Sequence, residues 1–232
     1  MECMTAELRE GFAATGPGPL TPDGCAVDLY VRLPAGQQPD IIAAAVPAGG
    51  TVLELGCGAG RVTHPLVERG YAVTAVDESA PMLERVRGAR TVRAPIQGLD
   101  LGERFDAVLL GSCLVHAHDP AVRRELLRTC RRHVADGGCV VIQREGADWH
   151  DDLPRESPLG TDGTARVVSS REYAPGVRQV HVEYVYPDAT WTQTFLSRPL
   201  SRDAFEQALA DAGLAVGAYL TDDHVWVRAL PV

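Results

Sequence analysis

The sequence predicts an α/β fold in which helices cover both faces of a doubly wound, mostly parallel sheet. Short apolar runs rich in β-forming residues alternate with segments that have helical spacing, and glycine or proline stands at the boundaries. Strands that alternate with helices form parallel pairs through right-handed crossovers, which leaves a ligand crevice at the carboxyl ends of the strands. The 232 residues are enough for one well-buried domain with a small elaboration.

Four short apolar runs are expected to be the parallel strands. Apolar residues at consecutive positions are typical of strands that are buried on both faces. The runs are Thr51–Leu55, Tyr71–Val76, Phe105–Leu110 and Gly138–Ile142.

The segments between these runs have the spacing of amphipathic helices. The apolar positions are Val62, Leu66 and Val67, then Met82, Leu83 and Val86, then Leu126, Leu127 and Val134. Ser79 and Asp119 stand just before prolines and are predicted to be helix N-caps. Helix ends are predicted at Gly70, Gly88 and Gly137.

After Gln143 the pattern changes to an alternation in twos, which indicates an antiparallel sheet. A last helix from Ser201 to Ala212 and strands Leu214–Leu220 and His224–Leu230 follow it, so the sheet is interpreted as an insertion after the fifth strand. We expect one domain overall, made of four segments. They are an N-terminal arm and lid (1–37), an α/β core (38–145), an antiparallel cap (146–200) and the closing helix and strands (201–232).

Composition excludes several classes of function. A net charge of −9 and a pI near 5.2 argue against a nucleic-acid partner. The chain has no apolar run of about 18 residues and no basic start followed by an apolar segment, which indicates a cytoplasmic protein without a membrane partner. Six cysteines without a C-x-x-C pair predict reduced thiols and no metal site. Lysine is absent, which excludes a Walker phosphate loop and a pyridoxal Schiff base.

The strongest local signal is a glycine-rich loop at the end of the first core strand. Gly56, Gly58 and Gly60 let the backbone approach a ligand closely, and the following helix presents free N–H groups. A nicotinamide or flavin fingerprint requires a glycine where this chain has Arg61. Glu54, two residues before the first glycine, suits a cationic amino-acid tail better than a pyrophosphate.

Asp77 ends the next strand, 17 residues after the last glycine of the loop. A carboxylate in this place can accept two hydrogen bonds from a ribose diol. Met82 follows at a distance that can bring a polarizable side chain near a purine.

Three motifs taken together resemble a known family. They are L-E-L-G-C-G-A-G-R from Leu53, V-D-E-S-A-P-M-L from Val76 and F-D-A-V-L-L-G-S from Phe105, and they resemble the successive motifs of the class I S-adenosylmethionine-dependent methyltransferases. The resemblance covers roughly residues 38 to 145. It implies a Rossmann-like sheet of seven strands, S-adenosyl-L-methionine as cofactor and S-adenosyl-L-homocysteine as product.

The resemblance also implies a set of cofactor-binding residues. Glu54 and the glycine loop would line the methionine and ribose parts, Asp77 would hold the ribose hydroxyls, and Arg32 would pair with the cofactor carboxylate. The whole set is Tyr30, Arg32, Glu54, Gly56, Cys57, Gly58, Gly60, Asp77, Glu78, Met82, Ile96, Gln97, Gly111 and Ser112.

The chain departs from the family in the loop that follows Arg93. The family usually offers the adenine amino group an acidic residue there, whereas this chain has Pro95 or Gln97. Gln97 can accept a hydrogen bond through its amide oxygen, and the backbone of Ile96 can serve the ring nitrogen.

Two residues beyond the cofactor motifs are candidates for proton transfer. His116 follows the strand that ends at Leu110 and can take a proton from an oxygen or nitrogen nucleophile, and Glu145 is the second candidate base. The alternatives are a loop histidine that only packs or meets water, and a strand end that is polar because it is exposed. Tyr184 and Trp191 alternate on the inserted sheet and either roof the substrate site or form cross-strand packing.

These observations predict methyl transfer to an O, N or C nucleophile of a small molecule, most simply a secondary metabolite. The protein's main task would be alignment, because the cofactor already carries an activated methyl group. Two alternatives stay open: a cofactor-binding homologue that only binds or that catalyses a cyclase or lyase step, and a nicotinamide oxidoreductase. Either a monomer or a homodimer fits the sequence.

Overall fold

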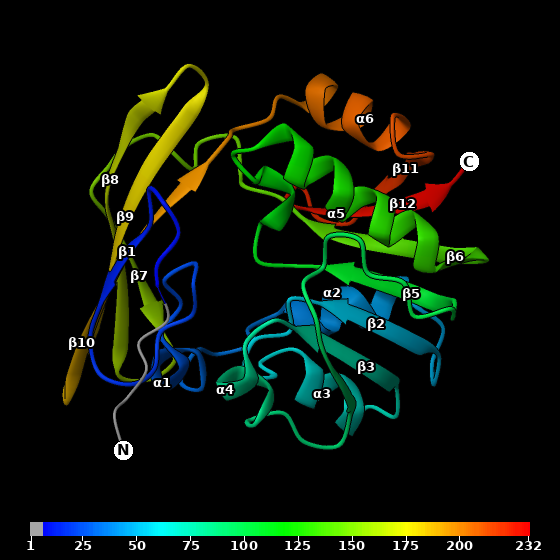
Figure 1. Cartoon of the computed structure of the whole chain (residues 1–232), viewed down its shortest axis with the longest axis horizontal. Coiled ribbons are helices and arrows are strands. Elements are labelled where there is room, and N and C mark those ends of the chain that lie inside the picture. The colour runs from blue at the N-terminus through cyan, green and yellow to red at the C-terminus, as the bar shows by residue number, and fades with distance from the viewer. Residues whose placement is uncertain (1–6) are drawn as a thin grey trace. The chain divides into compact units, whose positions relative to one another are not determined.

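The computed structural model describes residues 7–232, which divide into two compact units (Figure 1). The first six residues include Cys3 and the start of the predicted arm, and they lie outside the described residues. The α/β unit consists of Ala35–Ala147 and Leu200–Val232. The antiparallel unit consists of residues 7–34 together with Asp148–Pro199.

The α/β unit contains a mixed sheet of seven strands in the order β11-β12-β6-β5-β2-β3-β4. Its strands are β2 (Thr51–Leu55), β3 (Ala72–Asp77), β4 (Arg90–Arg93), β5 (Phe105–Leu110), β6 (Val134–Gln143), β11 (Leu214–Tyr219) and β12 (Trp226–Pro231). The strands β4, β3, β2, β5 and β6 pair in parallel, while β12 pairs antiparallel with both β6 and β11. The predicted fold class, a mostly parallel seven-stranded sheet, is confirmed.

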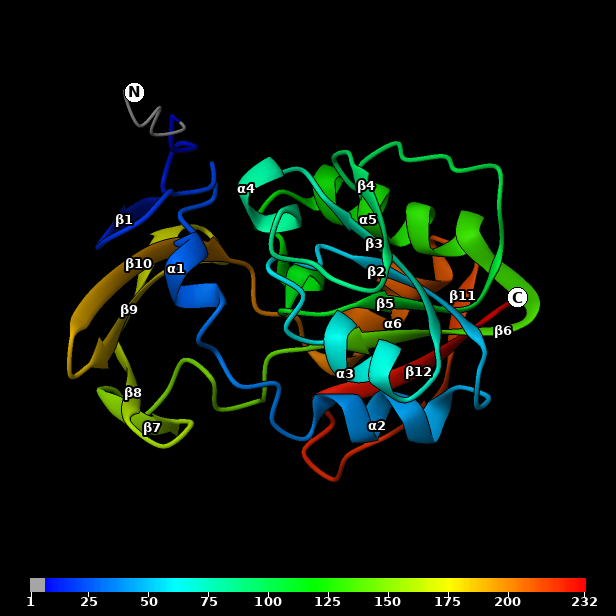
Figure 2. The ribbon, with the colours of Figure 1, turned by 90° about the horizontal axis from the view of Figure 1, so that it is seen from below.

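Helices cover both faces of this sheet. They are α2 (Gln38–Ala45), α3 (Thr63–Glu68), α4 (Ala80–Leu83), the 3₁₀ helix η1 (Leu114–His116), α5 (Pro120–His133) and α6 (Arg202–Ala210). Ile42 of α2 and Leu66 of α3 pack in one apolar core with Val52. Leu127 of α5 and Phe205 of α6 pack in a second core on the other face. Figure 2 shows α2 and α5 on opposite sides of the sheet.

The predicted N-caps are confirmed. Ser79 Oγ accepts a hydrogen bond from the backbone N–H of Met82 at 3.4 Å. Asp119 Oδ1 accepts one from Ala121 N at 2.8 Å. Each cap satisfies a donor that the first turn of a helix leaves unpaired.

The predicted helix end at Gly137 is wrong, because α5 ends at His133 and Val134 already belongs to β6. The pairing of β6 with β5 shifts register between Phe105 and Ala107, so the glycines lie in an irregularity of the strand. A Cβ on Gly138 would lie 2.7 Å from the carbonyl oxygen of Asp106. Glycine is therefore needed there for the close approach of two strands rather than for ending a helix.

The antiparallel unit is a five-stranded sheet in the order β1-β10-β9-β8-β7. Its elements are β1 (Ala13–Thr15), α1 (Val27–Tyr30), β7 (Arg155–Leu159), β8 (Gly163–Ala174), β9 (Val177–Tyr186) and β10 (Ala189–Ser197). All its strand pairs are antiparallel, as the alternation predicts for the insertion. The N-terminal segment supplies β1, which pairs with β10, so the arm and the insertion share one sheet.

Aromatic side chains hold the N-terminal segment to this sheet. Trp191 is buried, makes an edge-to-face contact with Tyr186 at a centroid distance of 6.0 Å, and lies opposite Tyr184 across the strands. Its indole N–H donates to the carbonyl of Pro17 at 2.8 Å. Cross-strand packing, one of the two roles considered for Trp191, is thus present.

Within residues 7–232 no helix is both long and apolar enough to cross a membrane. The five cysteines in this part of the chain are free thiols (Cys25, Cys57, Cys113, Cys130 and Cys139).

Candidate functional site

The glycine loop joins β2 to α3 at the carboxyl end of the sheet. The backbone N–H groups of Gly56 and Cys57 both donate to the carbonyl of Val76, at 2.9 Å each, which ties the loop to β3. Gly56, Gly58 and Gly60 have φ of 75°, 54° and 87°, a region that side chains with a Cβ rarely adopt. A Cβ on Gly56 would also lie 2.9 Å from Leu114 Cδ1. The loop therefore presents bare backbone over the strand ends.

Glu54 lies on β2 beneath this loop and is only 5% exposed. The hydroxyl of Thr63 donates to Glu54 Oε2 at 2.5 Å. Burial raises the pKa of the Glu54 carboxyl to about 7, although the Thr63 hydrogen bond and Arg61 act in the opposite direction. A buried carboxylate gains most from a nearby cation, because burial penalises its unpaired charge.

Asp77 is the last residue of β3 and connects two parts of the site. Its Oδ2 accepts a hydrogen bond from Gly58 N at 2.8 Å, and its Oδ1 accepts one from Ser79 N at 2.9 Å. Each carboxylate oxygen has a second acceptor position, so Asp77 can also accept from a pair of ribose hydroxyls. Glu78 follows it, and the side chain of Met82 is buried on α4.

The loop between β4 and β5 adjoins the glycine loop. A Cβ placed on Gly56 would lie 3.6 Å from Ile96 Cδ1. Gln97, the next residue, is exposed, and the carbonyl of Ile96 accepts a hydrogen bond from Thr129 Oγ1 at 2.9 Å. The predicted adenine-contact residues therefore lie beside the predicted ribose and methionine residues.

The segment after β5 has unusual backbone geometry. Ser112 and Cys113 both adopt left-handed conformations, with φ of 51° and 55°. Conformations of this kind are costly for residues other than glycine and cluster at functional sites. The N–H of Ser112 donates to Gln143 Oε1 at 2.9 Å, and a Cβ on Gly111 would meet no atom within 4 Å. Sequence reasoning missed Gln143, whose only signal is a polar side chain at the end of an apolar strand.

His116 and Glu145, the two candidate bases, lie together at the ends of η1 and β6. His116 Nε2 accepts a hydrogen bond from the backbone N–H of Glu145 at 3.1 Å, and His116 Nδ1 lies 3.3 Å from Glu145 Oε2. Their side chains are 3% and 5% exposed. We assign the neutral tautomer with hydrogen on Nδ1, because Nε2 is the acceptor. Both imidazole nitrogens of His116 therefore contact Glu145, one through its backbone N–H and one through its carboxylate. His116 is thus neither solvent-exposed nor held by apolar packing alone.

The charge of Glu145 also acts on the neighbouring thiol of Cys113. The pKa of Cys113 is raised well above its usual range, first by burial and then by the charge of Glu145. Cys113 is therefore a protonated thiol and no nucleophile at neutral pH.

Tyr30 and Arg32 belong to the antiparallel unit and have partners there. Cys25 Sγ donates to Tyr30 Oη at 3.0 Å. Arg32 forms a bidentate pair with Asp188, with N–O distances of 2.6 and 2.8 Å. A contact of either residue with a cofactor stays a prediction.

The remaining predicted cofactor residues all lie in the α/β unit, and their chemistry fits S-adenosylmethionine. Glu54 offers a buried carboxyl to a cationic amino-acid tail, Asp77 offers acceptors to a diol, and the glycine loop offers backbone without side chains. These features meet at the carboxyl ends of neighbouring parallel strands, where ligands bind in doubly wound folds.

The chain is similar in sequence to known methyltransferases. Residues 52–138 match a family model described as a methyltransferase domain. The chain is 36% identical over 108 residues to the ubiquinone biosynthesis O-methyltransferase of Caulobacter vibrioides, a match that covers 40% of each chain. It is 33% identical over 141 residues to the cypemycin N-terminal methyltransferase of a Streptomyces species, covering 54% of this chain and 56% of that protein. The chain thus spans about two fifths to just over half the length of these curated relatives.

A solved structure extends the likeness over nearly the whole chain. The sugar N-methyltransferase of a Streptoalloteichus species superposes with a TM-score of 0.67 and 21% sequence identity, covering 94% of this chain and 98% of that one. At this identity the likeness establishes a shared fold. Residues 52–138 therefore match a methyltransferase domain, and the chain as a whole shares the fold of this solved methyltransferase.

Proposed function

We propose that this protein transfers a methyl group from S-adenosyl-L-methionine to an O, N or C nucleophile of a small molecule. The observation that carries the proposal is the buried Glu54 carboxyl together with the Asp77 carboxylate, which accepts a hydrogen bond from Gly58 of the glycine-rich loop. When bound, the cofactor supplies an activated methyl group. The residues of the chain then have to bind the cofactor, orient the nucleophile and remove its proton.

Each part of the site has a distinct binding task. Glu54 pairs with the ammonium group, Asp77 accepts from the ribose hydroxyls, and Met82 lies toward the adenine. Gln97 and the backbone of Ile96 serve the adenine edge. Gly111, with open space at its Cα, leaves room beside the methionine part.

We assign the general base to Glu145 and a positioning role to His116. The Nδ1–H of His116 donates toward Glu145 Oε2, and the Glu145 N–H donates to His116 Nε2, so the carboxylate has a fixed orientation. An alcohol, a phenol or a protonated amine gives its proton to this carboxylate as it is methylated. A thiolate or carboxylate nucleophile needs no base.

The relatives support a small substrate. Among them are enzymes named for ubiquinone biosynthesis, for cypemycin and for a sugar. The net charge of −9 favours a small molecule over a nucleic acid. We propose a cytoplasmic enzyme of secondary metabolism that acts as a monomer or homodimer.

The first experiment measures thermal unfolding with S-adenosylmethionine, S-adenosylhomocysteine, NAD and no ligand. A ligand at 100 times its dissociation constant adds about 2.7 kcal/mol to stability when it binds only the native state. We expect both adenosyl compounds to raise the Tm and NAD to leave it unchanged. A shift with NAD alone would instead support an oxidoreductase.

Asp77→Asn should remove most of the shift given by S-adenosylhomocysteine. Asp223→Asn is the matched control, because Asp223 also accepts a backbone N–H two residues ahead, from Val225 at 3.0 Å, in a turn after β11. Mass spectrometry of products from a panel of small molecules then separates methylation from a cyclase or lyase step. Cofactor consumption without a methylated product would exclude methyl transfer.

A further inference from the structure

An irregular loop of residues 94–104 connects β4 to β5 and carries the predicted adenine contacts Ile96 and Gln97. The segment has no helix or strand, so its backbone groups need partners from elsewhere in the fold. Ile96 adjoins the glycine loop, as the 3.6 Å approach to a Cβ on Gly56 shows. Recognition of adenine through a backbone edge requires this loop to be held in place.

Three side chains on one face of α5 hold it. Thr129, Arg132 and His133 are spaced i, i+3 and i+4 and therefore share a helix face. Thr129 Oγ1 donates to Ile96 O at 2.9 Å, and Arg132 Nη1 donates to Leu99 O at 2.5 Å. His133 Nε2 accepts from Leu101 N at 3.0 Å. All three contacts are made to loop backbone, so they do not depend on which side chains the loop carries.

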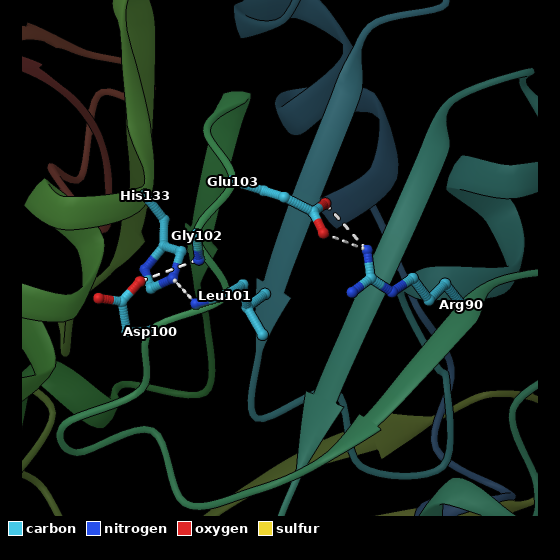
Figure 3. A network of polar contacts seen from close by, with 6 residues as sticks. All are labelled: Arg90, Asp100, Leu101, Gly102, Glu103 and His133. Atoms are coloured by element: carbon cyan, nitrogen blue, oxygen red, sulfur yellow. Dashed lines mark hydrogen bonds and ion pairs between the residues drawn. The ribbon is translucent and has the colours of Figure 1, made fainter.

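The geometry of His133 fixes its protonation state. The imidazole is fully buried, and its Nδ1 lies 2.9 Å from the carbonyl of Thr129, which can only accept a hydrogen bond. Nδ1 therefore carries the hydrogen, and Nε2 is the acceptor for the Leu101 N–H. Figure 3 shows this contact beside the turn in which Asp100 accepts from Gly102 N at 2.9 Å.

The far end of the loop is attached to the sheet. Arg90 Nη1 of β4 lies 2.8 and 2.9 Å from the two carboxylate oxygens of Glu103, as Figure 3 also shows. This pair is half-exposed and therefore contributes little by itself. The contacts with α5 are the buried or partly buried ones, and they lie nearer to Ile96 and Gln97.

We propose that Thr129, Arg132 and His133 are positioning residues for adenine recognition and set the selectivity of the site for the 6-amino purine. The inference rests on the proposed function. This chain lacks an acidic side chain at the position where Pro95 or Gln97 stands. The backbone of Ile96 and the side-chain amide of Gln97 therefore have to distinguish adenine from other purines. Such groups discriminate only when the loop is held to within a few tenths of an ångström.

The test compares two ligands by isothermal titration calorimetry. The first is S-adenosylhomocysteine, and the second is S-inosylhomocysteine, in which an oxygen replaces the 6-amino group. The wild-type protein should bind the adenosyl compound more tightly. Thr129→Val keeps the side-chain shape but removes the donor to Ile96, so it should weaken binding of the adenosyl compound about fivefold and leave the inosyl compound nearly unchanged.

Arg132→Ala is an independent variant. Like Thr129→Val, it should weaken binding of the adenosyl compound more than binding of the inosyl compound. Its matched control is Arg128→Ala on the same helix, because Arg128 pairs with Glu125 at 2.9 Å on an exposed surface. Arg128→Ala should retain the wild-type ratio of the two dissociation constants.

Equal weakening of both ligands in Thr129→Val and Arg132→Ala would show that the α5 contacts support folding alone, and would overturn the proposal. Wild-type dissociation constants for both ligands in the two variants would overturn it as well. Failure of the wild-type protein to bind either compound would overturn the proposed function itself, and this outcome is distinguishable because the wild-type protein is measured first.

Discussion

The Thr63 hydroxyl donates a 2.5 Å hydrogen bond to Glu54, and both side chains are buried. This hydrogen bond favours the charged carboxylate, whereas burial favours the protonated form. Burial dominates, because the pKa of Glu54 is raised to about 7. Near neutral pH the ligand-free protein therefore holds this carboxyl partly protonated, at the place where we expect a cofactor ammonium group.

Cofactor affinity should depend on the ionisation of Glu54. The ammonium group pairs with the carboxylate, so the Kd of S-adenosylhomocysteine should rise as the pH falls below about 7, approaching tenfold for each pH unit. Calorimetry between pH 5.5 and 8 measures this. Glu54→Gln should bind weakly with little dependence on pH; a wild-type affinity that is constant over this range would contradict the assignment.

Glu54→Gln should also change the stability of the ligand-free protein. The folded-state pKa is raised from 4.5 to about 7, so the folded protein binds more protons between these values and the free energy of unfolding falls as the pH rises through that window. Above pH 7 the penalty is complete and on the order of 3 kcal/mol, since each pKa unit corresponds to about 1.4 kcal/mol. The variant should therefore be more stable than the wild type at pH 8.

Urea unfolding at pH 5 and pH 8 measures that effect. The stability that Glu54→Gln gains over the wild type should be much smaller at pH 5, where the wild-type carboxyl is largely protonated. Glu68→Gln is the control, because Glu68 is exposed on α3. Equal stability of Glu54→Gln and wild type at pH 8 would mean that Glu54 is not penalised by burial.

Glu145→Gln should lower kcat by about 10² to 10⁴ for a substrate that must lose a proton, with the Kd of the cofactor unchanged. His116→Gln should have a smaller effect on kcat, because its target is the orientation of the Glu145 carboxylate. Glu125→Gln, on the surface of α5, is the control. Full activity of Glu145→Gln would remove this residue from the mechanism.

Arg32→Ala should destabilise the antiparallel unit more than Asp188→Ala. The Arg32 guanidinium lies over the rings of Tyr186 and Trp191, with centroid distances of 5.4 and 5.1 Å, in addition to its ion pair with Asp188. An exposed ion pair contributes little to stability, and the contacts with the two rings are additional to it, so removing the arginine should cost more than removing the aspartate.

Arg69→Ala is the matched control in denaturant unfolding, because the Arg69–Asp40 pair also measures 2.6 Å and its arginine is equally exposed. We expect a larger loss for Arg32→Ala than for Arg69→Ala. Equal losses would show that the stacking on the rings contributes nothing.

Most of the α/β unit can be predicted from the sequence, because strands buried on both faces need consecutive apolar residues and leave a readable pattern. The strand β4 at the sheet edge contains Arg90 and Arg93 and has no such pattern, since its side chains are mostly exposed. The strand β1 has only three residues, and β7 contains Pro158. Strands this short or irregular are determined by their partners across the sheet rather than by their own residues.

The site divides in the same way. Glu54, Asp77 and the glycine loop follow from motifs whose residues are close in sequence. The contact between His116 and Glu145 joins residues 29 apart and depends on two left-handed residues that are not glycine, for which the sequence offers no signal. The α5 contacts were missed because polar residues at i, i+3 and i+4 look like an ordinary solvent-facing stripe.

The pairing of β1 with β10 also has a consequence for the order of synthesis. Thr15 and Thr192, whose hydroxyls lie 2.7 Å apart, are separated by 177 residues. At a ribosomal rate of about 5 to 20 residues per second, the N-terminal segment is made roughly 9 to 35 s before its partner strand exists. During that interval the apolar side chains of the α1 segment lack Trp191, against which they pack in the folded protein. The nascent chain therefore passes through a stage in which the apolar residues of this segment are accessible to chaperones and to aggregation, and slower translation lengthens that stage.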